Sequence, residues 1–314
     1  MCIILLDKKS WHRLALLKRQ NIDEQTPNEW HKFVEKLSIQ VSGKPSERFK
    51  LLHLLSNSHC LFSWHLSLET ILMALGGKRL IFNCWGLPST RSWWKKLITR
   101  FVLRRATYVL VNDEITKNEV KLLAGVDAKI VPFYVDVDFF NYSPMTNRRD
   151  FLFCPGSNDR NPEVLLELAK RGFKVTWLVN DKDLKKKYTN QHPNFKIVSH
   201  ISFEDLRKLY QTCAMVILPL VKDDHAAGQT STLESISCGT PVIISAGRSA
   251  HIFSAFHTIY PITSLQIEQW VNRINMLMMN SNPNLQTLTN SSSNTLSIKL
   301  HSSRMYQLYC IYFK

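Results

Sequence analysis

The chain has 314 residues and is strongly basic, because 40 lysines and arginines outnumber 25 acidic residues and give a formal net charge of +15 at pH 7. This length leaves room for two medium-sized domains, each able to bury its own core. The charge suits polyanionic partners, namely nucleotides, an anionic membrane surface or nucleic acid.

Seven scattered cysteines, with no Cys-x-x-Cys pair, argue against a disulfide framework or a zinc site. No uncharged apolar run approaches the roughly 18 residues that a membrane-spanning helix needs. The apolar opening at residues 1–6 is too short for a signal peptide. We therefore expect a cytoplasmic protein with reduced thiols.

The N-terminal part of the chain predicts alternating strands and helices. A strand is expected at Cys2–Leu6, and helices are expected at Trp11–Arg19 and Glu29–Leu37. Further strands are expected at Leu61–Trp64, Arg79–Cys84, Tyr108–Val111 and Lys129–Val131, with helices at Leu66–Leu75, Ser92–Arg105 and Glu114–Ala124. This alternation favours a parallel sheet with right-handed crossovers.

The helix expected at residues 92–105 is amphipathic. Its apolar positions are Trp93, Trp94, Leu97, Ile98 and Phe101, and its basic positions are Lys95, Lys96, Arg100, Arg104 and Arg105. This pattern is typical of a helix lying in an anionic membrane surface. It is equally typical of a helix whose apolar face covers a sheet and whose charges are solvated. Both interpretations stay open.

Residues 141–150 are expected to link two domains, since they contain Pro144 and end in charged residues. We place the first domain at residues 1–142 and the second at residues 151–280. Residues 281–314 begin with a stretch that is rich in Asn, Ser and Thr and lacks periodicity. We expect them to form a poorly ordered polar tail.

The second domain continues the alternation. Strands are expected at Phe151–Cys154, Lys174–Val179, Phe195–Val198, Met215–Val221 and Val242–Ile244. Helices are expected after Asn161, around Lys182–Tyr188, from Ser202 to Tyr210, over Thr230–Cys238 and over Leu265–Met278. Asn161 is suited to cap its helix, and Ser202 with Asp205 forms a capping box. The last helix is expected to pack on this domain or to cross back to the first.

Arg160 follows the strand expected at residues 151–154 and precedes a helix N-terminus. Open α/β sheets bind ligands at the carboxyl ends of their strands. Arg160 is therefore a candidate for holding an anion, and the alternative is a solvated surface arginine.

The stretch from His225 to Val242 is the most informative part of the chain. It brings Gly228, Gln229 and Thr230 to a helix N-terminus, where backbone N–H groups and the helix dipole favour an anion such as phosphate. Glu234 follows Thr230 by four residues and shares its helix face. A carboxylate there can accept both hydroxyls of a ribose, and we do not expect it to belong to the core. The spacing suits a nucleotide diphosphate, and the alternative is an ordinary turn and helix.

The run Ala-Gly-Gln-Thr-Ser-x-Leu-Glu-x-x-x-x-Gly-x-Pro-Val, at residues 227–242, resembles the donor-site signature of the retaining glycosyltransferases of family 4, also called group 1. The segment at residues 129–140 resembles that family's passage out of its acceptor domain. The resemblance implies an α/β protein of the GT-B fold, with two Rossmann-like domains whose parallel sheets face a cleft. The first domain is shortened in this chain.

The resemblance also implies roles for particular residues. The donor pyrophosphate and ribose would be held by Gly156, Arg160, Gly228, Gln229, Thr230, Ser231 and Glu234. The family's usual first glutamate is replaced by Ala226, and His225 beside it is the expected substitute. On the acceptor side the family's histidine is replaced by Trp85, which Gly86 follows. His65 is the other candidate to line that site, although a packed or surface histidine is the alternative.

Two Asp-x-Asp runs, Asp136-Val-Asp138 and Asp181-Lys-Asp183, match the metal-binding signal of a different glycosyltransferase fold. So short a motif recurs by chance, and acidic residues at a helix start favour the dipole. We expect no metal, and no cofactor besides a nucleotide-diphosphate sugar as co-substrate.

The leading hypothesis is a glycosyltransferase that moves a sugar from a nucleotide-diphosphate donor to a cell-envelope glycan or lipid-linked acceptor. Retention is expected by same-face attack assisted by the leaving phosphate, with no protein nucleophile. Residues 92–105 would hold the protein peripherally on the inner face of the membrane. The alternative is a catalytically inactive protein of the GT-B fold that binds nucleotides or glycans. A nucleic-acid binder is a third possibility, which the charge permits but no motif supports.

Overall fold

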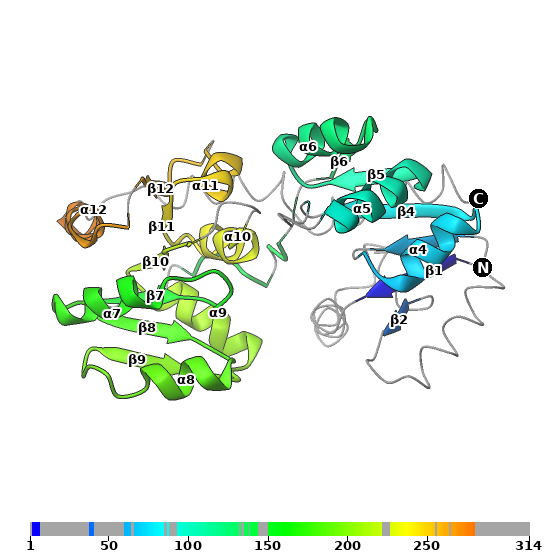
Figure 1. Ribbon diagram of the computed structural model, residues 1–314. Helices are drawn as coiled ribbons and strands as arrows, with labels where there is room; N and C mark the ends of the chain where they lie inside the picture. Colours follow the sequence, from blue (N-terminus) through cyan, green and yellow to red (C-terminus); the bar gives the residue numbers. More distant parts are fainter. Residues whose placement is uncertain are drawn as a thin grey trace. The chain divides into compact units, whose positions relative to one another are not determined.

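A computed structural model describes residues 2–6, 38–40, 60–63, 66–84, 87, 93–131, 133, 135–137, 139–143, 150–221, 227–254, 256–263 and 265–279. They form two compact units, and the second begins at Phe133 (Figure 1). The helices expected at residues 11–19 and 29–37 and the polar tail at residues 281–314 lie outside the described residues. Within the described part of the chain, no helix is both long enough and apolar enough to cross a bilayer.

The first unit is built on a six-stranded parallel sheet with the order β2-β1-β3-β4-β5-β6. The alternation of elements predicts a parallel sheet but not strand β2. Its strands are β1 (Cys2–Leu6), β2 (Ser38–Gln40), β3 (Cys60–Ser63), β4 (Arg79–Cys84), β5 (Tyr108–Val111) and β6 (Lys129–Ile130). Strands β3 to β6 follow one another in the sheet as they do in the chain. Right-handed crossovers therefore place their connecting helices on one face.

The connecting helices are α4 (Leu68–Leu75), α5 (Trp93–Arg105) and α6 (Glu114–Ala124), and α5 packs between the other two (Figure 1). Local signals set their ends. The Ser67 hydroxyl caps α4, the Asp113 carboxylate caps α6, and Gly125 ends α6 at a φ of 71°. The core beneath these helices includes Leu61, Leu80, Val102, Leu103, Val111 and Val120.

Helix α5 packs on the sheet mainly through residues outside its predicted apolar face. Its buried residues are Thr99, Val102 and Leu103. Trp93 is 72% exposed, Trp94 50% and Leu97 53%. Ile98 and Phe101 of the predicted apolar face are half-buried, and Phe101 packs against the core, so only part of that face covers the sheet.

The second unit also has a six-stranded parallel sheet, with the order β12-β11-β10-β7-β8-β9. Its strands are β7 (Phe151–Cys154), β8 (Lys174–Leu178), β9 (Phe195–Val198), β10 (Met215–Leu218), β11 (Val242–Ser245) and β12 (Ile259–Ile262). Its helices are α7 (Pro162–Lys170), α8 (Lys182–Tyr188), α9 (Phe203–Thr212), α10 (Gln229–Ser237), α11 (Arg248–Ile252) and α12 (Ile267–Met279).

The second sheet has a separate core on each face. One core includes Tyr210 from α9, Leu233 from α10 and Phe253 near α11. The other includes Leu165 from α7 and Trp270 from α12. The division follows from the order of the strands. From β7 to β9 the chain advances toward one edge of the sheet, and from β10 to β12 it advances toward the other edge, so right-handed crossovers place the two sets of helices on opposite faces.

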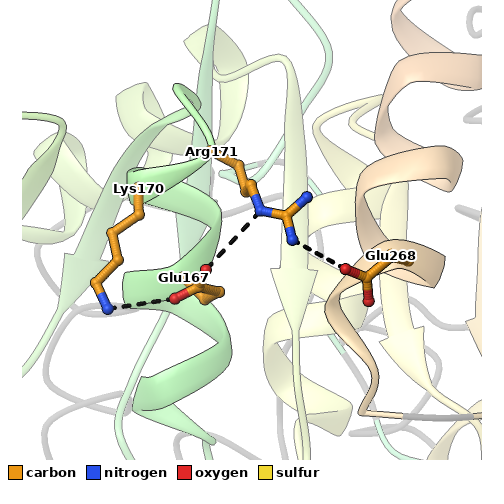
Figure 2. A network of polar contacts seen from close by, with 4 residues as sticks. All are labelled: Glu167, Lys170, Arg171 and Glu268. Carbon is orange, nitrogen blue, oxygen red and sulfur yellow. Dashed lines mark hydrogen bonds and ion pairs between the residues drawn. The ribbon is translucent and has the colours of Figure 1, made fainter.

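Helix α12 packs on its own unit, which answers the question that the sequence leaves open. Trp270 and Ile274 are fully buried in the core shared with α7. At the surface, Arg171 lies between Glu167 of α7 and Glu268 of α12 (Figure 2). Its guanidinium nitrogens lie 3.8 Å and 2.9 Å from the two carboxylates.

The segment at residues 139–143 packs on α9 and α10. Phe139 and Phe140 are buried in the core that contains Tyr210. The Ser237 hydroxyl donates to the Phe140 carbonyl, and the Gln211 amide donates to the Asn141 carbonyl at 2.8 Å. The sequence-based division gives residues up to 142 to the first domain, whereas these contacts tie residues 139–141 to the second unit.

Candidate functional site

The topology of the second sheet points to the carboxyl ends of two neighbouring strands as a ligand-binding position. Strands β7 and β10 are neighbours, and the chain leaves them in opposite directions across the sheet. This reversal is a topological switch point, where open parallel sheets bind ligands beyond the carboxyl ends of the strands. The loops that follow β7 and β10 carry Arg160 and Gly228, so two predicted site residues meet at this point.

Backbone hydrogen bonds join the two loops. Arg160 and Leu220 form an antiparallel bridge. The Asn161 N–H donates to the Pro219 carbonyl at 2.7 Å, and the Val221 N–H donates to the Asp159 carbonyl at 3.0 Å. These bonds explain why β10 ends at Leu218 rather than at Val221 as predicted, because the chain after Leu218 pairs with the loop and not with the sheet.

Arg160 is held inside the junction of the two loops. Its side chain is only 8% exposed, so it is not a solvated surface arginine. One terminal nitrogen donates to the Asn158 carbonyl and the other to the Pro155 carbonyl, both at 3.1 Å. The second also lies 3.5 Å from Ser231 Oγ on α10. Its Nε is buried and has no hydrogen-bond partner among the described residues.

The N-terminus of α10 lies directly beside this guanidinium. Gly228 is the N-cap, has a φ of 81° and offers no side chain to cap the helix. A Cβ at Gly228 would lie 3.5 and 3.6 Å from the two terminal nitrogens of Arg160. The positive end of the helix dipole and a buried cation therefore coincide, which favours an anion at this position.

Glu234 lies on α10 one turn beyond that N-terminus. It is 5% exposed, which contradicts the expectation that it stands outside the core. The Tyr210 hydroxyl donates to Glu234 Oε2 at 2.9 Å. Burial raises the pKa of Tyr210 well above its usual value, and the neighbouring charge of Glu234 acts in the same direction. The tyrosine therefore stays protonated and serves as a donor to the carboxylate.

Sequence reasoning did not identify Tyr210. Its contact to Glu234 joins two helices, and no spacing rule within one helix finds such a pair. The available signal was a tyrosine in the last turn of a helix that precedes a fully apolar strand. A tyrosine buried there needs a partner for its hydroxyl.

The other predicted donor residues lie on the same two loops. Gly156 has a φ of 77°, and its carbonyl accepts from the Trp177 indole at 2.9 Å. Gln229 is buried in the first turn of α10, beside the partly buried Thr230 and Ser231. His65, Trp85, Gly86 and His225, which were predicted for the sugar and acceptor side, lie outside the described residues, as does Ala226.

Buried polar side chains also stand at the carboxyl ends of strands in the first unit. Ser63 follows β3's apolar residues and bonds to Thr70 Oγ1 at 2.7 Å, and Asn83 is buried in β4. Asn112 directly follows β5, and its amide nitrogen donates to the Val131 carbonyl at 2.9 Å. Its Oδ1 is buried and lacks a hydrogen-bond partner within the part of the chain that the structure describes.

The two Asp-x-Asp runs have local roles. The Asp181 carboxylate caps α8 by accepting from the N–H groups of Asp183 and Leu184. Asp136 Oδ1 accepts from the Phe139 N–H at 3.1 Å, while Asp138 lies outside the described residues. Over the described ranges, no group of three or more His, Cys, Asp or Glu residues is placed to hold a metal ion.

No family model matches the sequence, and no curated protein matches it. Solved structures do match the fold. HepE from Anabaena in complex with UDP is 12% identical with a TM-score of 0.74, over 99% of this chain and all of that one. A glycosyltransferase from Rickettsia africae is 12% identical with a TM-score of 0.66, over 98% of this chain and 97% of that one.

A third protein of similar structure is an epimerase and not a glycosyltransferase. The UDP-GlcNAc 2-epimerase from Methanocaldococcus jannaschii is 13% identical with a TM-score of 0.55, over 99% of both chains. Together with the two parallel sheets, these matches show the α/β fold of GT-B glycosyltransferases. At such low identity they show the fold alone.

Proposed function

We propose that the chain is a glycosyltransferase that takes a sugar from a nucleotide-diphosphate donor and passes it to a cell-envelope glycan or lipid-linked acceptor. One observation carries this proposal. The buried Arg160 guanidinium lies beside Gly228 and Ser231 at the N-terminus of α10, with Glu234 one turn further along the same helix. HepE, which shares the fold, has been solved with UDP and with UDP-glucose.

The chemistry of the transfer explains this arrangement. Breaking the bond between the sugar and the diphosphate leaves negative charge on the phosphate oxygens. Positive groups that are already in place stabilise that charge without reorganisation. Arg160 supplies a full charge, and the first amides of α10, around Gln229, Thr230 and Ser231, supply partial charges. Glu234 would accept hydrogen bonds from the ribose hydroxyls, and Gly156 would let the first loop approach the phosphates.

The remaining roles follow the family 4 signature. Retention would proceed by attack on the face that the leaving phosphate vacates, with no protein nucleophile and no metal. His225 would contact the donor sugar in place of the family's glutamate, and His65, Trp85 and Gly86 would line the acceptor side. The protein's part in such a transfer is positioning and charge stabilisation.

We further propose that helices α4 and α5 hold the protein on the inner face of the membrane, where a lipid-linked acceptor lies. Trp93, Trp94 and Leu97 of α5 are at least half exposed. The neighbouring helix α4 exposes Leu68, Leu72 and Leu75, which lie on one helical stripe. Exposed Lys95, Lys96 and Arg100 accompany them, and α5 contains no acidic residue. Exposed tryptophans with basic neighbours suit an anionic bilayer surface.

A two-step experiment tests the transferase. The full-length protein is first screened by thermal shift against UDP-, ADP- and GDP-sugars, since a bound donor stabilises the folded state. The stabilising donor is then incubated with membrane lipid extract, and its products are separated. Transfer of sugar to lipid or glycan supports the proposal. Epimerised donor would identify a 2-epimerase instead, binding without turnover would favour the inactive binding protein, and no stabilisation by any donor would contradict the nucleotide site.

A further inference from the structure

Tyr210 is a core residue with one polar contact at its tip. Its side chain is fully buried, and its ring packs edge-on against Phe140 at 5.9 Å and Phe153 at 5.3 Å between ring centroids. Its own carbonyl accepts from Thr240 Oγ1 at 2.6 Å, which fixes the end of α9. A phenylalanine would make the same ring contacts. The hydroxyl is therefore the part of this residue that packing does not explain.

The hydroxyl reaches the functional face of α10. It donates to Glu234 Oε2 at 2.9 Å. Ser231 lies near it and lowers the pKa of Tyr210 against the larger raising effects of burial and of Glu234. Ser231 in turn lies 3.5 Å from an Arg160 nitrogen. Arg160, Ser231, Tyr210 and Glu234 thus form a row of neighbouring polar groups, in which the Tyr210–Glu234 hydrogen bond is the shortest contact.

These contacts restrict the rotation of the Glu234 side chain. A glutamate rotates about three side-chain bonds, and its carboxylate binds two ribose hydroxyls well only in one orientation. Tyr210 occupies one oxygen from the protein interior, which sets the plane of the carboxylate. A carboxylate has about four acceptor positions, so it can still receive the two hydroxyls of a ribose.

We propose that Tyr210 is a positioning residue of the donor site, which orients Glu234 for the ribose of a nucleoside diphosphate. This inference rests on the function proposed above. It predicts a loss that depends on the ribose hydroxyls and not on the phosphates or the base. A purely structural tyrosine would show no such dependence.

The test compares Tyr210→Phe with the wild type in the full-length chain. UDP, ADP and GDP are titrated first, and the tightest binder is paired with its 2′,3′-dideoxy form. Tyr210→Phe should weaken the ribose form about tenfold, as expected for a hydrogen bond to a charged group, and should change the dideoxy form less than twofold. Equal losses for the two forms, or no loss for either, would overturn the inference.

Tyr188→Phe is the matched control, because the buried Tyr188 also donates to a glutamate, Glu163, at 2.6 Å. It removes the same type of bond away from α10 and should leave both dissociation constants unchanged. A ribose-selective loss in this control as well would overturn the assignment to Tyr210. Failure of the wild type to bind any of the three diphosphates would instead contradict the proposed function itself.

A second variant covers the case in which Tyr210→Phe does not fold because it leaves a buried carboxylate without its donor. Glu234→Gln and the double variant Tyr210→Phe/Glu234→Gln bury no such charge. If Tyr210 acts through Glu234, adding Tyr210→Phe to Glu234→Gln should change ribose binding less than twofold. A further tenfold loss in the double variant would show that Tyr210 acts independently of Glu234 and would overturn the inference.

Discussion

The two terminal nitrogens of Arg160 lie 3.5 and 3.6 Å from the point that a Cβ on Gly228 would occupy. A methyl group at that point would stand at ordinary van der Waals distance from the guanidinium and would fill the space that the glycine leaves open beside it. The φ of 81° at Gly228 is also one that residues with a Cβ rarely adopt. The absence of a side chain at Gly228 thus permits both the left-handed backbone and the close position of the Arg160 guanidinium.

Gly228→Ala should therefore weaken nucleoside diphosphate binding as well as stability. The left-handed conformation costs an alanine about 1–2 kcal/mol, and the new methyl group would occupy the space directly beside the guanidinium, at van der Waals contact. Isothermal titration and thermal unfolding measure the two effects. Gly172→Ala is the control, because Gly172 has a φ of 96° but a Cβ there would meet nothing within 4 Å. It should lose stability and keep its affinity, and an equal affinity loss in both variants would refute the coupling to Arg160.

Arg160→Ala should weaken binding of a nucleoside diphosphate about ten- to a hundredfold, because it removes a charge-assisted contact to phosphate. The parent nucleoside should bind as it does to the wild type. Titration of both ligands measures the difference. Arg171→Ala, in the surface ion-pair network of Figure 2, removes an equal charge from the same unit and should affect neither ligand. Equal losses for nucleoside and diphosphate in Arg160→Ala would exclude the phosphate role.

Glu234→Gln should lower donor affinity or turnover about ten- to a hundredfold, since it keeps the shape of the side chain and removes its charge. A 2′,3′-dideoxy donor should bind the wild type poorly and lose little further on mutation. Some loss of thermal stability is also expected, because Glu234 is buried against Tyr210. The measurement is a cycle of two proteins and two donors, and additive losses would contradict the ribose contact.

Changing Lys95, Lys96 and Arg100 together to Gln should release the protein from vesicles that contain anionic lipid, measured by cosedimentation. Each basic residue near such a surface contributes about 1 kcal/mol, so the triple variant should bind more than a hundredfold less tightly. Arg104 is left unchanged because its Nε donates to the Ala124 carbonyl at the end of α6. Changing the exposed Lys182, Lys186 and Lys208 of the second unit to Gln removes the same charge. Equal release by the two variants would point to net charge rather than to α5.

Much of the fold could be predicted because local chemistry decides where its elements begin and end. Asn161 and Ser202 cap their helices as expected, and Gly239 takes the left-handed conformation that ends α10, with a φ of 69°. Strand β12 was not predicted, and it contains Pro261, a residue that is rare inside a sheet. The proline is tolerated there because β12 is at the edge of the sheet.

The parts that could not be predicted depend on contacts between distant segments. The stripe that α5 buries is chosen by the sheet beneath it, and the sequence offers two stripes of similar apolar character. The partnership of Tyr210 and Glu234 joins residues on separate helices. The start of α10 was recognisable as a candidate site, because its glycine, hydroxyl and acidic residues lie close together in the chain.

The anchoring of residues 139–141 on α9 and α10 decides where the chain can be cut without damage. A fragment of residues 151–298 would lack Phe139 and Phe140, and so would leave the Tyr210 side of the core open to water. Each lost aromatic side chain removes burial worth about 1.5–3 kcal/mol. A fragment of residues 133–298 keeps both rings, so it should melt cooperatively and bind little hydrophobic dye. The shorter fragment should bind the dye strongly and melt at a lower temperature. The second unit should therefore be separable from the first only together with residues 139–141, which precede its first strand.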